Sequence, residues 1–222
     1  LLPLLCFQAL STYADNYPKN LNIDILHYTF ELKLSDATDE IWGVTTIRVL
    51  FKKEGIDKLR LDLVKANEAL QGKGMTVESI MQQGKTLAYS HADNVLWISL
   101  PQPSHANSES QLVITYHGIP ADGLRIGPTK YGDRSFFNEN WPNRARHWLP
   151  TVDHPYEKAS SEFVVTAPAH YQVVSNGLLM EETNLDASTK LTHWKQAVPV
   201  SSWLYVLGVA EFAVQYVGWF EG

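Results

Sequence analysis

The residues that could do chemistry in this chain are concentrated between positions 136 and 155. This segment reads Phe-Phe-Asn-Glu-Asn-Trp-Pro-Asn-Arg-Ala-Arg-His-Trp-Leu-Pro-Thr-Val-Asp-His-Pro and combines carboxylates with two arginines, two tryptophans and three prolines. Proline fixes φ and stiffens a loop at little entropic cost. A stiff backbone that presents charged side chains suits a binding edge. The alternative is a long loop that packs its aromatic rings on the sheets and closes local Arg–Asp ion pairs.

Familiar catalytic motifs are absent from the sequence. It contains no His-Glu-x-x-His, no Gly-x-Ser-x-Gly, no Walker loop and no Gly-x-Gly-x-x-Gly. His147, His154 and Glu157 are conceivable metal ligands, but their spacing fits no familiar site, so we expect ordinary polar roles for them. The single cysteine, Cys6, excludes an internal disulfide and a cysteine-rich zinc site. We therefore predict no metal site and no catalytic residue within these 222 residues.

The composition suits one globular domain. Hydrophobic residues make up 45% and charged residues 19% of the chain, which is enough apolar material for a core and excludes a disordered protein. The net charge is −6 and there is no run of Lys or Arg. This charge distribution excludes the basic footprint of a nucleic-acid-binding protein.

The elements that must position the segment are predicted to be short strands. Apolar and polar residues alternate with the period of two that is typical of half-buried strands. Such runs lie near 28–34, 47–51, 59–63, 87–89, 96–100, 112–116, 163–167, 171–175 and 191–195. No long stretch has a helical period, so the sequence predicts an all-β fold, a sandwich of many short strands.

Several local features refine this prediction. His91–Asn94 reads as a hairpin turn, and Asn176-Gly177 is the strongest short hairpin signal in the chain. Trp42 and Val44 have the opposite parity to Ile47, which predicts a β-bulge near 45–46. The run 203–214 is apolar on both faces and is predicted to be a central strand. Residues 121–158 have no clear period, and we expect them to form a long irregular functional loop.

The segment resembles a known family of zinc peptidases, that of aminopeptidase N and leukotriene hydrolase. The family pattern is roughly Gln/Glu-x-x-Pro-x-x-Ala-Arg-x-x-Phe-Pro-x-x-Asp-x-Pro in the N-terminal domain. The positions that match are Glu139, Pro142, Ala145, Arg146, Pro150, Asp153 and Pro155, with Leu149 where Phe is commoner. The resemblance is closest to a bacterial branch that has Asn-Trp-Pro-Asn-Arg-Ala-Arg and Asp-His-Pro.

The resemblance extends over most of the chain. Residues 23–28 resemble the opening strand of the family, and Trp42-Gly43-Val44 resembles its Phe-x-Gly turn. Residues 175–177 and 199–212 resemble a later hairpin and the closing strand. The family implies a saddle-like all-β domain that caps a thermolysin-like zinc domain. It places the zinc ligands and the general base in that next domain, so the zinc of the parent enzyme would have its ligands outside this chain.

The resemblance also implies roles for individual residues. An acid or amide at the position of Glu139 holds the free α-amino group of a peptide substrate. This role is physically reasonable, because an ammonium has three donors and a carboxylate accepts them in charge-assisted bonds. Arg146 and Asp153 resemble bracing residues around Pro150, and Pro142 and Pro155 belong to the same loop architecture. The implied partners are peptide N-termini and the chain's own downstream catalytic domain, and this chain alone is expected to be inactive.

The two ends suggest boundaries. Residues 1–15 begin with the apolar run Leu-Leu-Pro-Leu-Leu-Cys-Phe-Gln-Ala-Leu, which reads as the remnant of a signal peptide with a cleavage site at 9–11, or as a tail. We accordingly expect an extracytoplasmic protein. The alternative for this run is a buried first strand or helix; it is too short to span a bilayer, which needs ~20 residues. Residues 16–215 are predicted to be the β domain and residues 216–222 the start of a missing catalytic domain.

Two other function classes remain open from the sequence. Seven tryptophans and ten tyrosines could form the stacking platforms of a carbohydrate-binding or adhesion module. Such platforms need exposed aromatic side chains along one sheet face, so their position discriminates this class. The chain could also be a non-catalytic relative that uses the same fold as a scaffold.

Overall fold

The computed structural model describes residues 15–215 and 217–218. The predicted signal-peptide remnant therefore lies outside the described residues except for Asp15. Most of the predicted start of the next domain, 216–222, also lies outside them.

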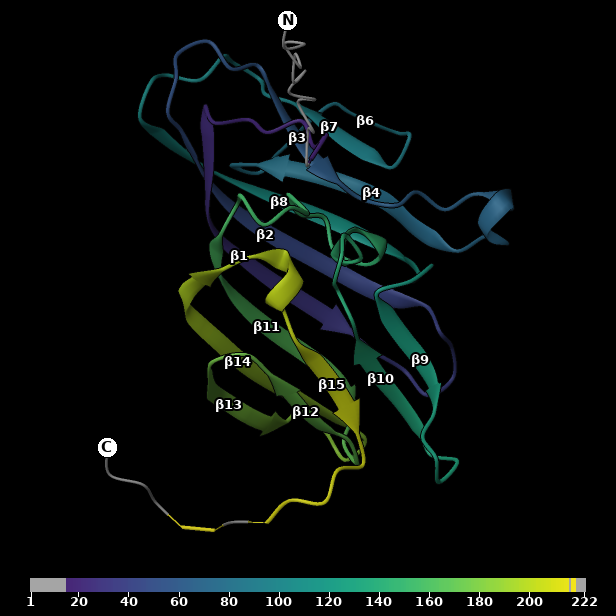
Figure 1. Cartoon of the computed structure of the whole chain (residues 1–222). Helices are drawn as coiled ribbons and strands as arrows, with labels where there is room; N and C mark the ends of the chain where they lie inside the picture. The colour runs from purple at the N-terminus through teal and green to yellow at the C-terminus, as the bar shows by residue number, and fades with distance from the viewer. Residues whose placement is uncertain (1–14, 216, 219–222) are drawn as a thin grey trace, which may run out of the picture.

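The largest layer is an eight-stranded sheet that runs through the whole molecule (Figure 1). Its strand β1 pairs with β2 in antiparallel fashion through ten of its eleven residues, and with β11 on its other side in parallel fashion. In sheet order the strands are β13 (Leu178–Asn184), β14 (Thr189–Val200), β11 (Ala159–Pro168), β1 (Ile23–Lys33), β2 (Ile41–Phe51), β8 (Ser108–Ile119), β4 (Gly74–Gln82) and β5 (Lys85–Thr86).

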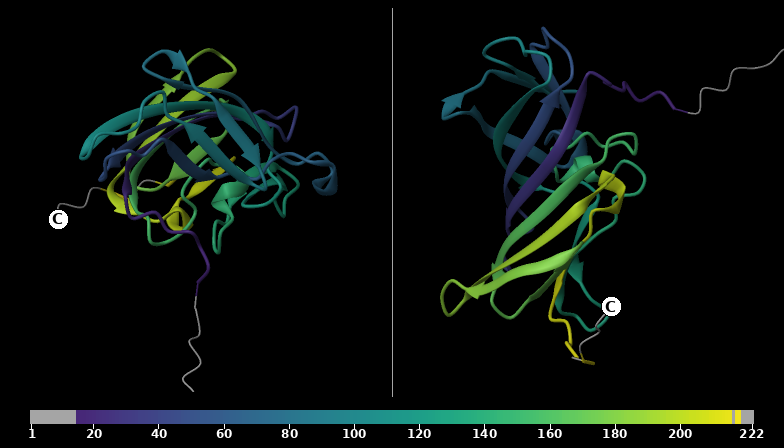
Figure 2. Two further views of the ribbon diagram at one scale, coloured as in Figure 1. Left: turned by 90° about the horizontal axis from the view of Figure 1, so that it is seen from above. Right: turned by 90° about the vertical axis from the view of Figure 1, so that its left-hand side faces the viewer.

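Two smaller sheets form the second layer, and Figure 2 shows them from two further sides. The four-stranded sheet has the order β12 (Gln172–Ser175), β15 (Leu207–Ala210), β10 (Arg134–Asn138) and β9 (Leu124–Pro128). The three-stranded sheet consists of β3 (Lys58–Asp62), β7 (Val95–Ser99) and β6 (Tyr89–Ala92). The all-β prediction, with a sandwich of many short strands, is confirmed.

Helical structure in the described residues is limited to single 3₁₀ turns. These are η1 (Glu68–Leu70), η2 (Ala145–His147) and η3 (Ser202–Leu204). None of the described helices is long and apolar enough to cross a membrane.

The core between the layers contains a cluster of aromatic rings. Phe30 of β1 lies opposite Phe163 of the parallel strand β11, and their ring centroids are 5.0 Å apart. Tyr205 packs edge-on against both rings. Trp148 stacks on Phe163 at 6.1 Å and is fully buried, although it belongs to the chemically rich segment. That segment is therefore anchored in the core through one of its own side chains, and burial of an aromatic ring of this size contributes about 2–3 kcal/mol.

The turn at Asn176-Gly177 does not form the predicted hairpin. β12 before it pairs with β15 of the four-stranded sheet, whereas β13 after it pairs with β14 of the eight-stranded sheet. The turn therefore carries the chain from one layer to the other. Asn176 Oδ1 accepts the backbone N–H of Val206 at 2.6 Å. Gly177 has φ +85°, and a Cβ there would also overlap the carbonyl oxygen of Lys195. A tight turn within one hairpin and a tight turn between two sheets need the same residue types. The strands β15 and β14, with which β12 and β13 pair, decide which of the two forms.

Two predictions about β2 are also wrong. Trp42-Gly43-Val44 is not a turn but part of the strand, and its pairing with β8 runs without a break, so there is no bulge at 45–46. Trp42 faces outward and stacks on His117 of β8, with centroids 4.5 Å apart. Gly43 faces inward because the ring of Tyr116 occupies the place of its side chain. Trp42 is apolar but faces outward, and its neighbour Gly43 faces inward without a side chain, so the alternation of apolar residues in the sequence suggests the wrong face.

The predicted irregular loop is shorter than 121–158. Its first half contains the hairpin β9–β10, and the long stretch without a strand is reduced to residues 139–158. Phe136 of β10 is buried whereas Phe137 is 58% exposed, which hides the period of two in the sequence. Similarly, the predicted strand 203–214 is reduced to η3 and the four residues of β15, which does lie inside its sheet as expected.

Candidate functional site

Glu139 follows the last residue of β10 and lies between two buried asparagines. Asn138 donates from Nδ2 to the Tyr205 carbonyl at 2.7 Å and accepts the backbone N–H of Leu207. Asn140 donates to the carbonyls of Ser202 at 3.0 Å and Tyr205 at 3.2 Å. The backbone on both sides of Glu139 is therefore held to the segment 202–207.

Because alternate residues of an extended chain point to opposite sides, Glu139 faces outward. Its side chain is exposed, and its backbone N–H donates to the Gly123 carbonyl at 2.8 Å. One carboxylate oxygen, Oε1, accepts the N–H of Trp141 at 3.0 Å. No described Lys, Arg or His makes an ion pair with Glu139. The two arginines of the segment have other partners, Asp122 for Arg144 and Asp153 for Arg146. Glu139 is thus an oriented anion with one oxygen left open.

An aromatic pair lies next to this carboxylate. The indole of Trp141 is 60% exposed and meets the ring of Trp203 edge-to-face, at 6.5 Å and an interplanar angle of 83°. The Trp141–Pro142 peptide bond is cis. Trp203 belongs to η3, the same turn whose carbonyl at Ser202 receives Asn140. The carboxylate and the two indoles therefore share one support.

Arg146 and Asp153 are brought together around Pro150. The Asp153 Oδ2 accepts Arg146 Nε at 2.9 Å and the Arg146 backbone N–H at 3.2 Å, and Arg146 Nη2 donates to the Asp153 carbonyl at 2.9 Å. Asp153 and Pro150 are buried, whereas Pro142 is exposed and Pro155 is half-buried. The arrangement closes residues 146–153 into a compact loop, the position in which a brace would act.

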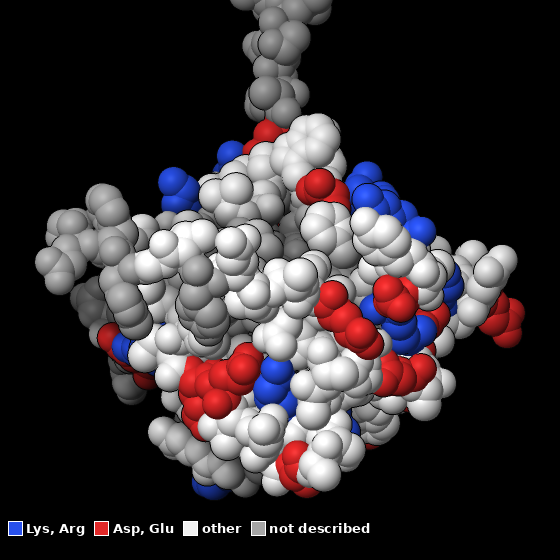
Figure 3. Space-filling model, turned by 90° about the horizontal axis from the view of Figure 1, so that it is seen from below, with Lys and Arg blue, Asp and Glu red and all other residues white. Residues whose placement is uncertain are grey.

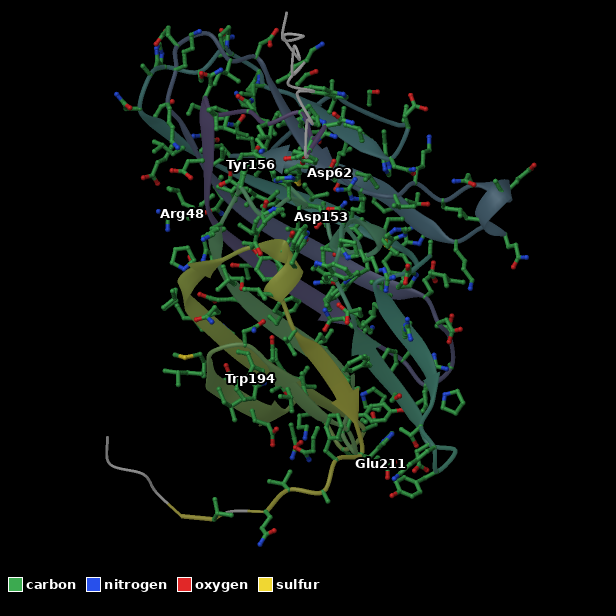
Figure 4. The ribbon with its side chains drawn as sticks, in the orientation of Figure 1. Arg48, Asp62, Asp153, Tyr156, Trp194 and Glu211 are labelled. Atoms are coloured by element: carbon green, nitrogen blue, oxygen red, sulfur yellow. The ribbon has the colours of Figure 1, made fainter. Side chains whose placement is uncertain are left out.

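Sequence reasoning missed the second carboxylate of this cluster. Asp62, at the end of β3, is fully buried and accepts the backbone N–H of Asp153 at 2.9 Å (Figure 4). Arg60 Nη2 lies 2.8 Å from Asp62 Oδ1, and the hydroxyl of Tyr17 donates to Asp62 Oδ2. Burial, followed by the charge of Asp62, raises the pKa of Tyr17 well above its ordinary value and keeps it a donor. Asp62 is out of phase with the buried Leu59 and Leu61 of β3, so the alternation in the sequence predicts an outward side chain and gives no signal of this role.

Four more residues that support the site escaped the sequence analysis. Asn138, Asn140 and Trp148 lie in the segment 136–155 and Ser202 lies outside it, but nothing in their spacing indicates that they support the loop. Trp148 Nε1 donates to Asn140 Oδ1 at 3.0 Å, and the Ser202 hydroxyl donates to Asp153 Oδ1 at 2.7 Å. These bonds connect the Glu139 backbone to the Arg146–Asp153 loop through η3. Their partners lie 8 to 69 residues away, so only the fold brings them together.

The three conceivable metal ligands are not brought together. His154 Nε2 lies 2.9 Å from Asp15, and Glu157 Oε1 accepts the Ile25 N–H at 2.9 Å. Burial lowers the pKa of His147. Among the described residues there is no group of three or more His, Cys, Asp or Glu side chains that could hold a metal ion. The described part of the chain therefore does not fit a zinc ion, and no step of a metal-dependent reaction can be derived from it.

Glu157 is the most perturbed carboxyl near the site. Burial raises its pKa from the ordinary 4.5 to about 7, against the opposing effect of the hydrogen bond from Ile25 N–H. Asp24 adds to the rise because it is a second acid nearby. Glu157 points toward the start of β1 rather than toward Glu139, so its perturbation reflects packing and not the candidate site.

A hollow of about 510 Å³ is lined in part by Trp203. Its wall includes Tyr17, Pro142, Asn143, Arg146 and His154. The charged groups in it are already paired, Arg146 with Asp153 and His154 with Asp15. The hollow therefore offers shape but no free charge to a ligand.

The surface charge and the exposed aromatics limit the function classes. Seen from below, acidic and basic side chains are interspersed (Figure 3), in keeping with the absence of a basic run in the sequence. The exposed tryptophans Trp42, Trp97 and Trp141 lie on the eight-stranded sheet, on the three-stranded sheet and in the loop, respectively. They do not form the single row that a carbohydrate-stacking face needs.

The sequence of this two-layer all-β domain matches a known peptidase family. Residues 25–204 match the sequence profile described as the Peptidase M1 N-terminal domain, and the chain belongs to this family. The family resemblance seen in the sequence is thus confirmed.

Three relatives show the extent of the similarity. "Probable aminopeptidase 2" of Sulfurisphaera tokodaii is 22% identical over 146 residues, which are 64% of this chain and 18% of that protein. An M1 zinc metallopeptidase mutant of Deinococcus radiodurans bound to a Tyr-Ser-Ala substrate has a TM-score of 0.71 at 23% identity, covering 85% of this chain and 42% of that one. Native yeast LTA4 hydrolase has a TM-score of 0.72 at 19% identity, covering 89% and 30%. The chain thus spans less than half the length of each of these relatives.

Proposed function

We propose that this chain is the substrate-anchoring N-terminal domain of a zinc aminopeptidase, and that Glu139 holds the free α-ammonium group of a peptide. The observation that carries the proposal is the state of Glu139 itself. It is an exposed carboxylate without an ion-pair partner among the described residues, on a backbone fixed from both sides by Asn138 and Asn140. An uncompensated anion held in place by buried bonds is what selective capture of a cation requires.

The chemistry of the anchor explains the removal of single residues. A carboxylate accepts charge-assisted hydrogen bonds from an ammonium, and such bonds are shorter and stronger than neutral ones. Since Oε1 already accepts the Trp141 N–H, the side chain is oriented and loses little freedom when it binds. A peptide fixed by its terminal amine presents its first peptide bond at a constant distance from the anchor. The zinc that activates water would be bound by another part of the longer protein.

The proposed partner within that protein is a catalytic domain, and an apolar area supports this. The outer face of the four-stranded sheet exposes Phe137 by 58%, Val174 by 45% and Phe212 by 45%. Phe137 and Val174 flank Gly208 on neighbouring strands, and Phe212 lies over that glycine. Leu204 and Val206 continue the apolar area toward Trp203. Contiguous exposed apolar side chains beside a candidate site are typical of a surface that another domain covers.

The function is tested with Glu139 variants of the full-length protein. A charged hydrogen bond contributes about 1.5–3 kcal/mol, so Glu139→Ala should lower kcat/KM on aminoacyl anilides by roughly 10- to 150-fold. Glu139→Gln should lose less, because the amide oxygen still accepts a bond. Glu68→Ala, at another exposed acid, is the matched control and should leave kcat/KM unchanged. N-acylated substrates should show no dependence on Glu139, and an enzyme with lower thermal stability but normal kcat/KM would show that Glu139 is a loop brace instead.

The 222-residue chain by itself is proposed to be inactive. Purified and dialysed, it should retain less than stoichiometric zinc and release no aminoacyl-anilide product, because zinc sites need three or four ligands. One equivalent of tightly bound zinc, with activity that follows the zinc content, would contradict this.

A further inference from the structure

We propose that the exposed indole of Trp141 is the wall that receives the side chain of the peptide's first residue, so that the preferred substrates begin with a large apolar or aromatic residue. This inference rests on the proposed role of Glu139 and specifies the substrate class of the same site. It is carried by the position of Trp141 two residues after Glu139, by the exposure of the Trp141 indole and by its edge-to-face contact with Trp203.

Glu139 and Trp141 are exposed on the same side of the chain, because buried Asn140 lies between them and side chains alternate along an extended backbone. Trp141 N lies 3.0 Å from Glu139 Oε1, so the Trp141 Cα is within ~4.5 Å of the carboxylate, one further bond away. An ammonium bound at the same carboxylate would sit ~2.8 Å from an oxygen, and its side chain begins two bonds further on. A side chain longer than that of alanine can then reach the Trp141 indole, which is exposed on the same side of the chain as Glu139.

The indole is available and supported. It is 60% exposed, far more than the fully buried Trp148 in the same segment. Its contact with Trp203 is edge-to-face, a favourable geometry for aromatic pairs that leaves much of the Trp141 surface open. Trp203 in turn follows Ser202, which donates to buried Asp153 and accepts Asn140. The backbone beside Trp203 is therefore held in place, which lowers the cost of ordering the indole pair when a ligand binds.

The charges around the pair favour an apolar first side chain. Arg144 is engaged by Asp122 at 3.3 Å and Arg146 by Asp153 at 2.9 Å, so neither arginine is free to pair with an acidic side chain. The open oxygen of Glu139 is committed to the ammonium. Leu204, 58% exposed on the same turn as Trp203, extends the apolar surface.

The experiment measures selectivity in the full-length, zinc-loaded protein. The quantity is the ratio of kcat/KM for Phe-anilide to that for Ala-anilide, in which changes of enzyme concentration or stability cancel. Burial of a large apolar side chain against the wall predicts that Trp141→Ala lowers this ratio by about 5- to 30-fold, chiefly through the Phe substrate. Trp141→Phe should keep most of the ratio. Trp42→Ala, an exposed tryptophan on the outer face of the eight-stranded sheet, is the control and should not change it.

A second measurement does not depend on turnover. The affinities of phenylalanine amide and alanine amide for the zinc-free full-length protein, compared by calorimetry, should differ in the wild type and converge in Trp141→Ala. An unchanged ratio in Trp141→Ala, together with a loss of activity in Glu139→Ala, would overturn the inference and leave the proposed function standing. An equal loss on both substrates in Trp141→Ala would also overturn it, since Trp141 would then act through the orientation of Glu139. A wild-type protein that hydrolyses no substrate would overturn the proposed function and the inference with it.

Discussion

The backbone N–H of Asp153 donates to Asp62 Oδ2 at 2.9 Å, which places two fully buried carboxylates side by side. Arg146 Nη2 lies 3.9 Å from Asp62 and its Nε 2.9 Å from Asp153, and Arg60 contacts Asp62 from the other side. The guanidinium groups of Arg60 and Arg146 thus balance the carboxylates of Asp62 and Asp153, where the three-stranded sheet meets the segment 136–155. Buried charges are stable only when they are paired and hydrogen-bonded in this way.

Removal of one carboxylate should destabilise the domain strongly. Asp153→Ala leaves Arg146 without its main partner and Ser202 without its acceptor, so we expect a loss of about 2–4 kcal/mol in the free energy of unfolding, as for a broken buried ion pair. The measurement is urea unfolding of the 222-residue chain. Glu109→Ala serves as the control, because Glu109 and Arg48 form an exposed pair with side chains 54% and 51% accessible, and should cost less than about 1 kcal/mol. Equal losses in the two variants would show that the buried network does not hold the loop.

Glu157 should make the stability depend on pH between about 4.5 and 7. Its pKa is raised in the folded state, so the folded chain keeps a proton that the unfolded chain releases, and stability decreases as the pH rises through this window. Glu157→Gln cannot release a proton, although its amide oxygen can still accept the Ile25 N–H. We therefore expect it to be more stable than the wild type by about 1–3 kcal/mol at pH 8 and nearly equal to it at pH 4. A difference in unfolding free energy that is the same at both pH values would contradict the raised pKa.

Gly177 should tolerate no side chain. Its φ of +85° strains any other residue, and a Cβ would overlap the Lys195 carbonyl. Gly177→Ala should lower the free energy of unfolding by about 2–4 kcal/mol, because the clash is with backbone of the neighbouring strand. Gly84 has φ +76° but nothing within 4 Å of its Cβ position, so Gly84→Ala isolates the conformational cost and should lose about 1 kcal/mol. Similar losses at the two sites would mean that β13 moves freely to accommodate the methyl group.

The proposed export of the protein makes a prediction about its N-terminus. We expect the mature protein to begin near Thr12, after cleavage of a signal segment, and to lie outside the cytoplasm. Cleavage there keeps Asp15 and Tyr17, which contact His154 and Asp62 respectively. N-terminal sequencing of the native protein tests this. An intact Leu1 on cytosolic protein would show that the first apolar run has another role.

The sequence by itself determined the fold class and the family. Alternation of apolar and polar residues is a local consequence of strand geometry, so β1, β3 and β8 could be predicted without knowing their partners. The hairpin turn at 91–94 could be predicted from its residue types, and Asp93 and Asn94 adopt the positive φ that the turn demands. The order of residues from Glu139 to Pro155 indicated the family, and Glu139 was the member of that set for which the resemblance implied a substrate-binding role.

Only the tertiary structure decided which elements meet. β12 and β13 flank one turn and belong to different sheets, because the buried area that each gains depends on strands far along the chain. Asp62 and Asp153 lie 91 residues apart, and no local pattern records their contact. The same holds for Trp148, whose indole is buried on Phe163 while Trp141, seven residues earlier, is exposed. Both are tryptophans in one loop, and the difference arises from which ring finds a cavity in the core between the sheets. The free energy of packing depends on contacts throughout the fold, whereas the alternation of residues along the sequence reports only on local structure.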